Sequence, residues 1–130
     1  MTEYLFDSTV LIDHLRGRPV VAPYLNAVFD GTTKAWFSVV TEAELWAGIR
    51  SPDERTKYEA LFALMKRINV TKDIARHAGS YFGKYRHQGL FLPDALIAAS
   101  ALISKKTLLT RNSKHFRWVQ DDFKVEFYTL

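Results

Sequence analysis

The chain has 130 residues, no cysteine and a formal net charge of +4, which fits a single domain, residues 1–130, with one hydrophobic core. The absence of cysteine excludes disulfide bonds, thiol catalysis and cysteine-based zinc sites, and it agrees with a reducing, cytoplasmic setting. No apolar stretch reaches the roughly 20 residues that would span a bilayer, and the amino terminus lacks the pattern of a secretory signal, so we expect no membrane segment.

Strands and helices are predicted to alternate along the whole chain. Short runs of β-branched and aromatic residues predict strands at residues 3–6, 35–40, 68–70, 107–110 and 124–130. Helical periodicity and helix-capping residues predict helices at residues 9–16, 20–31, 41–49, 51–67, 71–89 and 93–106. This alternation indicates an α/β fold with three layers, in which helices cover both faces of a mainly parallel central sheet of four to five strands.

Three acidic residues lie just beyond predicted strands or at the start of a helix. Asp7 follows the first strand, Glu44 follows the strand at 35–40, and Asp94 begins the helix at 93–106. Because the carboxyl ends of parallel strands share one edge of a sheet, these acids are expected to converge. Each also has a simpler interpretation, since Asp7 suits a helix N-cap and Asp94 interacts favourably with a helix dipole.

Glu44 also has a simpler interpretation, as part of a helix-capping box. The chain contains a second such pattern, which serves as a comparison. Thr41 and Glu44 have the spacing of a capping box, and so do Ser51 and Glu54. The Ser51 pattern lies away from any strand end and predicts a cap alone. The Thr41 pattern directly follows the most convincing strand, where a ligand-binding edge is expected, and this favours a functional role for Glu44.

Three converging carboxylates repel one another unless a cation compensates their charge. Oxygen ligands without histidine or cysteine suit hard cations such as Mg²⁺ or Mn²⁺. In a basic chain, such a site is typical of a phosphodiesterase in which the metal activates water and neutralises the scissile phosphate. A phosphotransferase with Asp7 as nucleophile is a more remote alternative, because Thr9 stands where such enzymes carry a second aspartate.

Four motifs, in this order and covering nearly the whole chain, resemble PIN-domain ribonucleases, and most closely the VapC toxins of bacterial toxin–antitoxin pairs. The motifs are YLFDSTVLIDHLRG (4–17), SVVTEAELWAGI (38–49), PDALIAASAL (93–102) and LLTRNSKHF (108–116). The resemblance implies a PIN-like fold, a homodimer, Mg²⁺- or Mn²⁺-dependent cleavage of RNA, and neutralisation by a cognate VapB-type antitoxin.

Carried over residue by residue, the resemblance assigns Asp7, Glu44 and Asp94 as catalytic metal ligands. Ser8 and Thr9 match the small polar residues after the first acid, and they are expected to hydrogen-bond that acid or a phosphate.

The fourth motif departs from the family pattern, because Asn112 and His115 stand where relatives often have an acid. Asn112 and Thr110 still offer oxygen atoms, and Arg111 is predicted to bind phosphate. With fewer charges, one metal site is expected and a second stays open. The alternative function is a catalytically weak PIN-like module that binds RNA or protein.

The remaining charged residues are predicted to lie at the surface, where some of the basic ones can contact RNA. Asp13 is expected at the surface, because six helical residues turn it about 240° away from Asp7. His115 is interpreted as a surface or loop histidine. Basic side chains predicted to follow an RNA backbone are Arg16, Arg18, Lys34, Arg111, Lys114 and Arg117.

Overall fold

The computed structural model describes residues 2–130 and contains a five-stranded parallel sheet. The strands are β1 (Glu3–Phe6), β2 (Lys34–Ser38), β3 (Lys66–Ile68), β4 (Thr107–Thr110) and β5 (Val125–Phe127). Their order in the sheet is β3-β2-β1-β4-β5, and all four pairings are parallel. The predicted α/β class with a mainly parallel sheet is therefore confirmed. The strand β1 lies at the centre, so its carboxyl end, just before Asp7, lies in the middle of one sheet edge.

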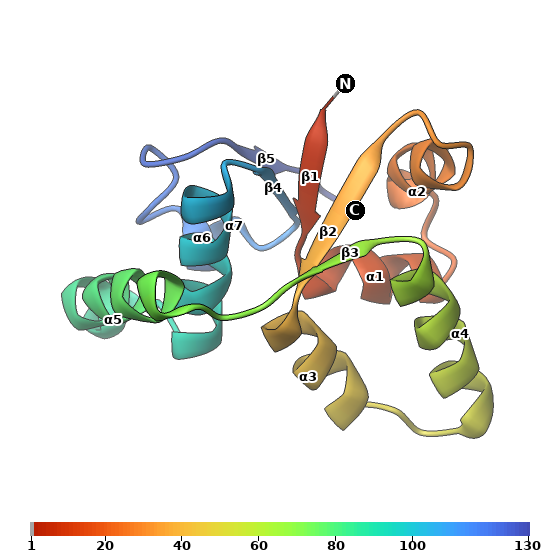
Figure 1. Ribbon diagram of the computed structural model, residues 1–130, viewed down its shortest axis with the longest axis horizontal. Coiled ribbons are helices and arrows are strands. Elements are labelled where there is room, and N and C mark those ends of the chain that lie inside the picture. Colours follow the sequence, from red (N-terminus) through yellow and green to blue (C-terminus); the bar gives the residue numbers. More distant parts are fainter. Residues whose placement is uncertain (1) are drawn as a thin grey trace.

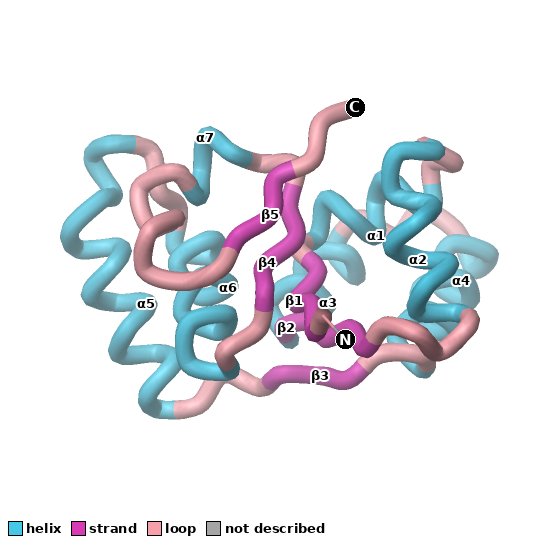
Figure 2. The backbone as a smooth tube through the Cα atoms, turned by 90° about the horizontal axis from the view of Figure 1, so that it is seen from above, coloured by secondary structure: helices cyan, strands magenta, loops and turns pink. Residues whose placement is uncertain are grey.

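Helices cover both faces of this sheet (Figures 1 and 2). The α-helices are α1 (Ser8–Leu15), α2 (Ala22–Phe29), α3 (Val39–Ala47), α4 (Pro52–Ala63), α5 (Lys72–Tyr85), α6 (Leu92–Ser104) and α7 (Ser113–Phe116), with short 3₁₀ turns η1 (Pro19–Val21) and η2 (Arg86–Gln88). Figure 2 shows α1, α2 and α4 on one side of the strands and α5, α6 and α7 on the other. Among residues 2–130, no helix is both long and apolar enough to cross a membrane.

The core follows the alternation of side chains along the strands. Phe6 packs with Phe37 and the residues of α1 and α4 on one face of the sheet. Its neighbour Leu5 packs with Ile97 of α6 and Leu108 on the other face. Successive strand residues point to opposite faces, so the two buried residues that precede Asp7 anchor it from both sides of the sheet.

Several element boundaries differ from the sequence-based expectation, and the helix predicted at 51–67 ends at Ala63. The strand predicted at 35–40 ends at Ser38, because the Ser38 side chain accepts a hydrogen bond from the Val40 N–H at 3.0 Å and begins α3 there. Thr41 thus lies inside the helix, and the predicted capping box at Thr41 and Glu44 is wrong. The strand predicted at 68–70 is also shifted, and β3 occupies residues 66–68.

The second predicted cap is present at the start of α4. The Ser51 side chain accepts a hydrogen bond from the Glu54 N–H at 3.2 Å. The Glu54 carboxylate in turn accepts one from the Arg50 N–H at 2.9 Å. These two bonds hold the turn between α3 and α4 against the first turn of α4.

Candidate active site

The three predicted acids line one cavity at the carboxyl edge of the sheet. Asp7 follows β1, Glu44 lies in the second turn of α3, and Asp94 lies in the first turn of α6. The cavity is lined by Asp7, Ser8, Thr9, Ile12, Glu44, Phe91, Pro93, Asp94, Asn112 and His115. The fold therefore brings together side chains that are up to 87 positions apart in the sequence.

Asp7 is the most deeply buried of the three, with 4% of its surface exposed. It occupies the N-cap position of α1, but its side chain makes no capping hydrogen bond. Its Oδ2 instead accepts hydrogen bonds from the hydroxyls of Thr110 at 2.6 Å and Thr9 at 3.2 Å. Burial raises the pKa of Asp7, although these hydroxyls act in the opposite direction. The Asp7 side chain therefore does not cap α1, and capping does not explain its burial.

Glu44 lies at the more exposed mouth of the cavity. Its Oε1 accepts a hydrogen bond from Ser8 Oγ at 2.8 Å, and Ser8 also lies 3.2 Å from the Thr41 hydroxyl. Partial burial raises the pKa of Glu44, and the negative charge of Asp7 adds to that effect. Ser8 therefore connects α1 to α3 and holds the glutamate beside the first acid.

Asp94 forms a pair with His115, whose Nδ1 lies 2.9 Å from Asp94 Oδ2. The Asn112 side-chain amide lies 2.6 Å from the same Nδ1. Burial raises the pKa of Asp94 to about 6; repulsion from Asp7 and Glu44 adds to that rise, and His115 opposes it. The interpretation of His115 as a surface or loop residue is therefore wrong, since it is half-buried in the cavity and contacts a predicted metal ligand.

The cavity suits a hard cation in its chemistry. Carboxylate and hydroxyl oxygens make up most of its polar groups, together with the Asn112 amide and the His115 ring. No lysine or arginine among residues 2–130 pairs with any of the three acids. Burial raises the pKa values of all three acids, and repulsion from neighbouring carboxylates adds to the rise at Glu44 and Asp94. Within the described residues, no three side chains are arranged as a metal-binding cluster, so a shared cation requires these side chains to turn toward one another.

A model of the PIN domain matches residues 4–120 of the chain. The chain belongs to the PIN-domain family. Ribonuclease VapC19 of Mycobacterium tuberculosis is 38% identical over 119 residues, which cover 90% of this chain and 94% of the relative. Ribonuclease VapC10 of the same species is 40% identical over 115 residues, covering 86% and 84%. The resemblance to VapC-type PIN domains is thereby confirmed.

A solved structure supports the same classification of this PIN domain. A toxin–antitoxin complex from Klebsiella pneumoniae contains a chain that superposes with a TM-score of 0.79 at 27% identity. The match covers 98% of this chain and 99% of that chain. The likeness therefore extends over the whole fold and includes the elements that carry the cavity.

Asp13 and Arg111 differ from their sequence-based interpretations within this PIN domain. Asp13 was expected at the surface but is fully buried. Arg111 was expected to bind phosphate, yet its Nε and Nη2 donate to Asp13 at 2.8 and 3.1 Å. Arg111 does not line the cavity. Its guanidinium instead connects the end of β4 to α1, beside the predicted metal ligands.

Sequence reasoning did not assign His115 or Phe91 to the site. His115 reaches Asp94 because Asn112 precedes the short helix α7, which turns the histidine back toward α6. Phe91 is 58% exposed and packs edge-on against the His115 ring, with centroids 5.0 Å apart. A signal for His115 was present, since it occupies the position in the fourth motif where an acid was expected.

Proposed function

We propose that this PIN domain is a metal-dependent endoribonuclease toxin that cleaves RNA phosphodiester bonds and is neutralised by a VapB-type antitoxin. The observation that carries the proposal is the convergence of three carboxylates, from the end of β1, from α3 and from α6, on one cavity. Among residues 2–130, no lysine or arginine pairs with any of them. The names of the relatives, Ribonuclease VapC19 and VapC10, support the choice of RNA as substrate. The net charge of +4 suits a polyanion.

Asp7, Asp94 and Glu44 would hold Mg²⁺ or Mn²⁺ directly or through water. A bound cation supplies the activation of a water nucleophile and the neutralisation of the scissile phosphate. One site is proposed. A second stays open, because Asn112 and His115 carry less negative charge than the acid expected there.

The surrounding side chains hold these ligands in place. The hydroxyls of Thr110 and Thr9 orient the Asp7 carboxylate, and Ser8 does the same for Glu44. His115 holds one oxygen of Asp94, with its Nδ1 at 2.9 Å from Oδ2. Fixed hydrogen bonds of this kind reduce the reorganisation that metal and substrate binding require.

The proposal is tested by incubating purified protein with total bacterial RNA in Mg²⁺ or Mn²⁺ and in EDTA. We expect cleavage with metal, none with chelator, and a loss of at least about a thousandfold, or ~4 kcal/mol, in the variants Asp7→Asn and Asp94→Asn. Asp73→Asn, at an exposed position in the first turn of α5, is the matched control. Activity that survives both chelation and the two substitutions would exclude the mechanism.

The second candidate is a catalytically weak module that binds RNA or protein, and the histidine in place of a fourth acid favours it. It predicts RNA binding with little cleavage and no stimulation by metal. The toxin function predicts growth arrest on expression, relieved by Asp7→Asn and by co-expression of the antitoxin. A homodimer is also proposed, and light scattering after gel filtration checks it.

A further inference from the structure

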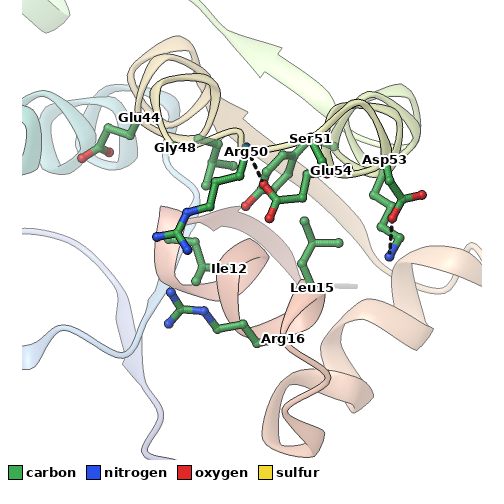
Figure 3. Close-up of a pocket in the computed structure, with 12 residues that line it drawn as sticks. Ile12, Leu15, Arg16, Glu44, Gly48, Arg50, Ser51, Asp53 and Glu54 are labelled. Carbon is green, nitrogen blue, oxygen red and sulfur yellow. Dashed lines mark hydrogen bonds and ion pairs between the residues drawn. The ribbon is translucent and has the colours of Figure 1, made fainter.

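A second and larger groove, of about 530 Å³, borders the candidate active site. The two cavities share Ile12 of α1 and Glu44 of α3 as lining residues. The groove then continues between the end of α1 and the turn that joins α3 to α4 (Figure 3). It is therefore a continuation of the carboxylate cavity along the surface rather than a separate site.

Two arginines enter this groove from different elements. Arg16 follows the last residue of α1, and Arg50 lies in the turn before α4. Figure 3 shows both guanidinium groups extending toward the Ile12 side of the groove, with Glu44 at its far end. The two positive charges thus lie in the groove that Glu44 joins to the carboxylate cavity.

Neither arginine is neutralised by a carboxylate. Among residues 2–130, no acid lies within ion-pair distance of the Arg16 or Arg50 guanidinium. Two acids that line the groove are already engaged. Asp53 pairs with Lys57 at 3.1 Å, and Glu54 accepts the Arg50 backbone N–H at 2.9 Å. Like charges that converge without a partner gain most from an anion bound between them.

Both arginines have a fixed backbone relative to the carboxylates. The Arg16 N–H donates to the Ile12 carbonyl at 3.0 Å, so this residue continues the helix that begins after Asp7. At 1.5 Å per residue, α1 separates the two positions by about 13 Å. Arg50 is held by the cap at the start of α4. A phosphate a few nucleotides from the scissile bond therefore reaches the arginines while the scissile phosphate lies at the acids.

We infer that Arg16 and Arg50 form a phosphate-binding subsite for the RNA backbone that flanks the scissile bond. The inference rests on the proposed function, because it takes the substrate to be RNA. A guanidinium group binds phosphate oxygens through two parallel N–H donors, which makes arginine better suited than lysine to this task. Continuity with the carboxylate cavity favours an RNA strand over an acidic segment of a protein partner.

The test measures binding of a fluorescently labelled single-stranded RNA of about a dozen nucleotides, in EDTA, by anisotropy across a range of salt concentrations. The double variant Arg16→Ala/Arg50→Ala is expected to bind about tenfold more weakly. The slope of log K against log salt should fall by about 1.4, since each phosphate contact to a single strand contributes about 0.7. Arg16→Lys/Arg50→Lys should keep most of the slope and only part of the affinity.

The control variant is Arg76→Ala/Arg86→Ala, which removes the same charge from exposed positions on α5 and η2. A slope unchanged in Arg16→Ala/Arg50→Ala, or reduced equally in the control, overturns the subsite. Normal RNA binding by Arg16→Ala/Arg50→Ala together with weakened binding of the antitoxin also overturns it and assigns the arginines to an acidic protein segment.

Different results would contradict the proposed subsite and the proposed nuclease activity. Metal-dependent cleavage by the wild-type protein with an unchanged salt slope in Arg16→Ala/Arg50→Ala overturns the subsite alone. The expected loss of slope without any cleavage by the wild-type protein supports the subsite and overturns only the nuclease. Absence of RNA binding by the wild-type protein overturns both.

Discussion

Asp7 and Asp13 are two buried carboxylates six positions apart at α1, and their surroundings are opposite. Asp13 is fully buried and accepts hydrogen bonds from Arg111, from Arg18 at 2.9 Å and from the Tyr128 hydroxyl at 2.7 Å. Asp7 is almost as buried, but its side-chain donors are the hydroxyls of Thr110 and Thr9. Burial is thus common to both residues, and positive charge is present at only one of them.

The difference appears in the protonation of the two groups. Burial by itself raises the pKa of Asp13, but the hydrogen bonds from Arg111 and Tyr128 and the nearby positive charges outweigh it and lower the pKa overall. For Asp7, burial prevails and the pKa is raised. A neutralised carboxylate contributes to stability, whereas an uncompensated one attracts a cation. The comparison separates a structural acid from a candidate metal ligand without reference to any relative.

The Asp13 cluster also positions the candidate site. Arg111 directly follows β4 and Tyr128 directly follows β5, so their bonds to Asp13 connect α1 to two neighbouring strand ends. Thr110, at the end of β4, donates to Asp7. Asp13 therefore holds together α1 and β4, the two elements that orient Asp7.

The largest expected effect is that of Asp13→Ala. This change leaves Arg111, Arg18 and Tyr128 without their common acceptor, and removal of one partner from a buried ion pair costs about 3–5 kcal/mol. Urea unfolding measures the loss. The control Asp53→Ala removes an exposed acid paired with Lys57 and should change the free energy of unfolding by less than about 1 kcal/mol. Equal small effects in both variants would contradict the structural role.

The second effect concerns pH. The folded-state pKa of Asp94 lies near 6, above its ordinary value, so the folded protein binds the proton more tightly than the unfolded chain. The free energy of unfolding of the metal-free protein should therefore rise as pH falls from about 7 to about 5, by about 1.3 kcal/mol. Thermal unfolding in EDTA measures it, and Asp94→Asn should remove most of the rise.

Asp13 has the opposite effect on the pH dependence of stability, and it does so at lower pH. Because its pKa is lowered in the folded state, its contribution is present above the unfolded value near 4 and is lost as pH falls below it. Stability that falls steadily from pH 7 to pH 5 would contradict the assignment of uncompensated charge at Asp94.

The third effect is stabilisation by metal at pH 7. If the carboxylates bind Mn²⁺ only in the folded protein, a concentration of about 100 times the dissociation constant should raise the free energy of unfolding by about 2.7 kcal/mol. Asp94→Asn should abolish most of this gain, whereas Tyr128→Phe, which leaves both arginines on Asp13, should not. Calorimetry with and without Mn²⁺ distinguishes these results.

The smallest effect is that of Tyr128→Phe, which removes one hydrogen bond to Asp13 and leaves both arginines in place. A loss of about 1 kcal/mol in the free energy of unfolding is expected. Stabilisation by Mn²⁺ should be unchanged, because Tyr128 does not line the carboxylate cavity. A weaker response to Mn²⁺ in this variant would show that the two acids are not independent.

The amino-acid sequence by itself determined the fold class, and it singled out the three acids that line one cavity. Strand and helix periodicities are local, and most elements lie where these patterns predict them. The cap at Ser51 follows from four neighbouring residues and is present. The position of Asp7 follows from the rule that parallel strands end at one edge. Glu44 lies in the helix that directly follows β2, and Asp94 in the first turn of the helix before β4.

Only the tertiary structure decided which partner each charged side chain has. Helical periodicity predicted that Asp13 points away from Asp7. It did not show that Asp13 faces Arg111 and Tyr128, which are 98 and 115 positions away in the sequence. The contact between His115 and Asp94 and the convergence of Arg16 and Arg50 likewise depend on how separate elements pack. The energy of a buried charge depends on such distant neighbours, and local sequence patterns do not specify them.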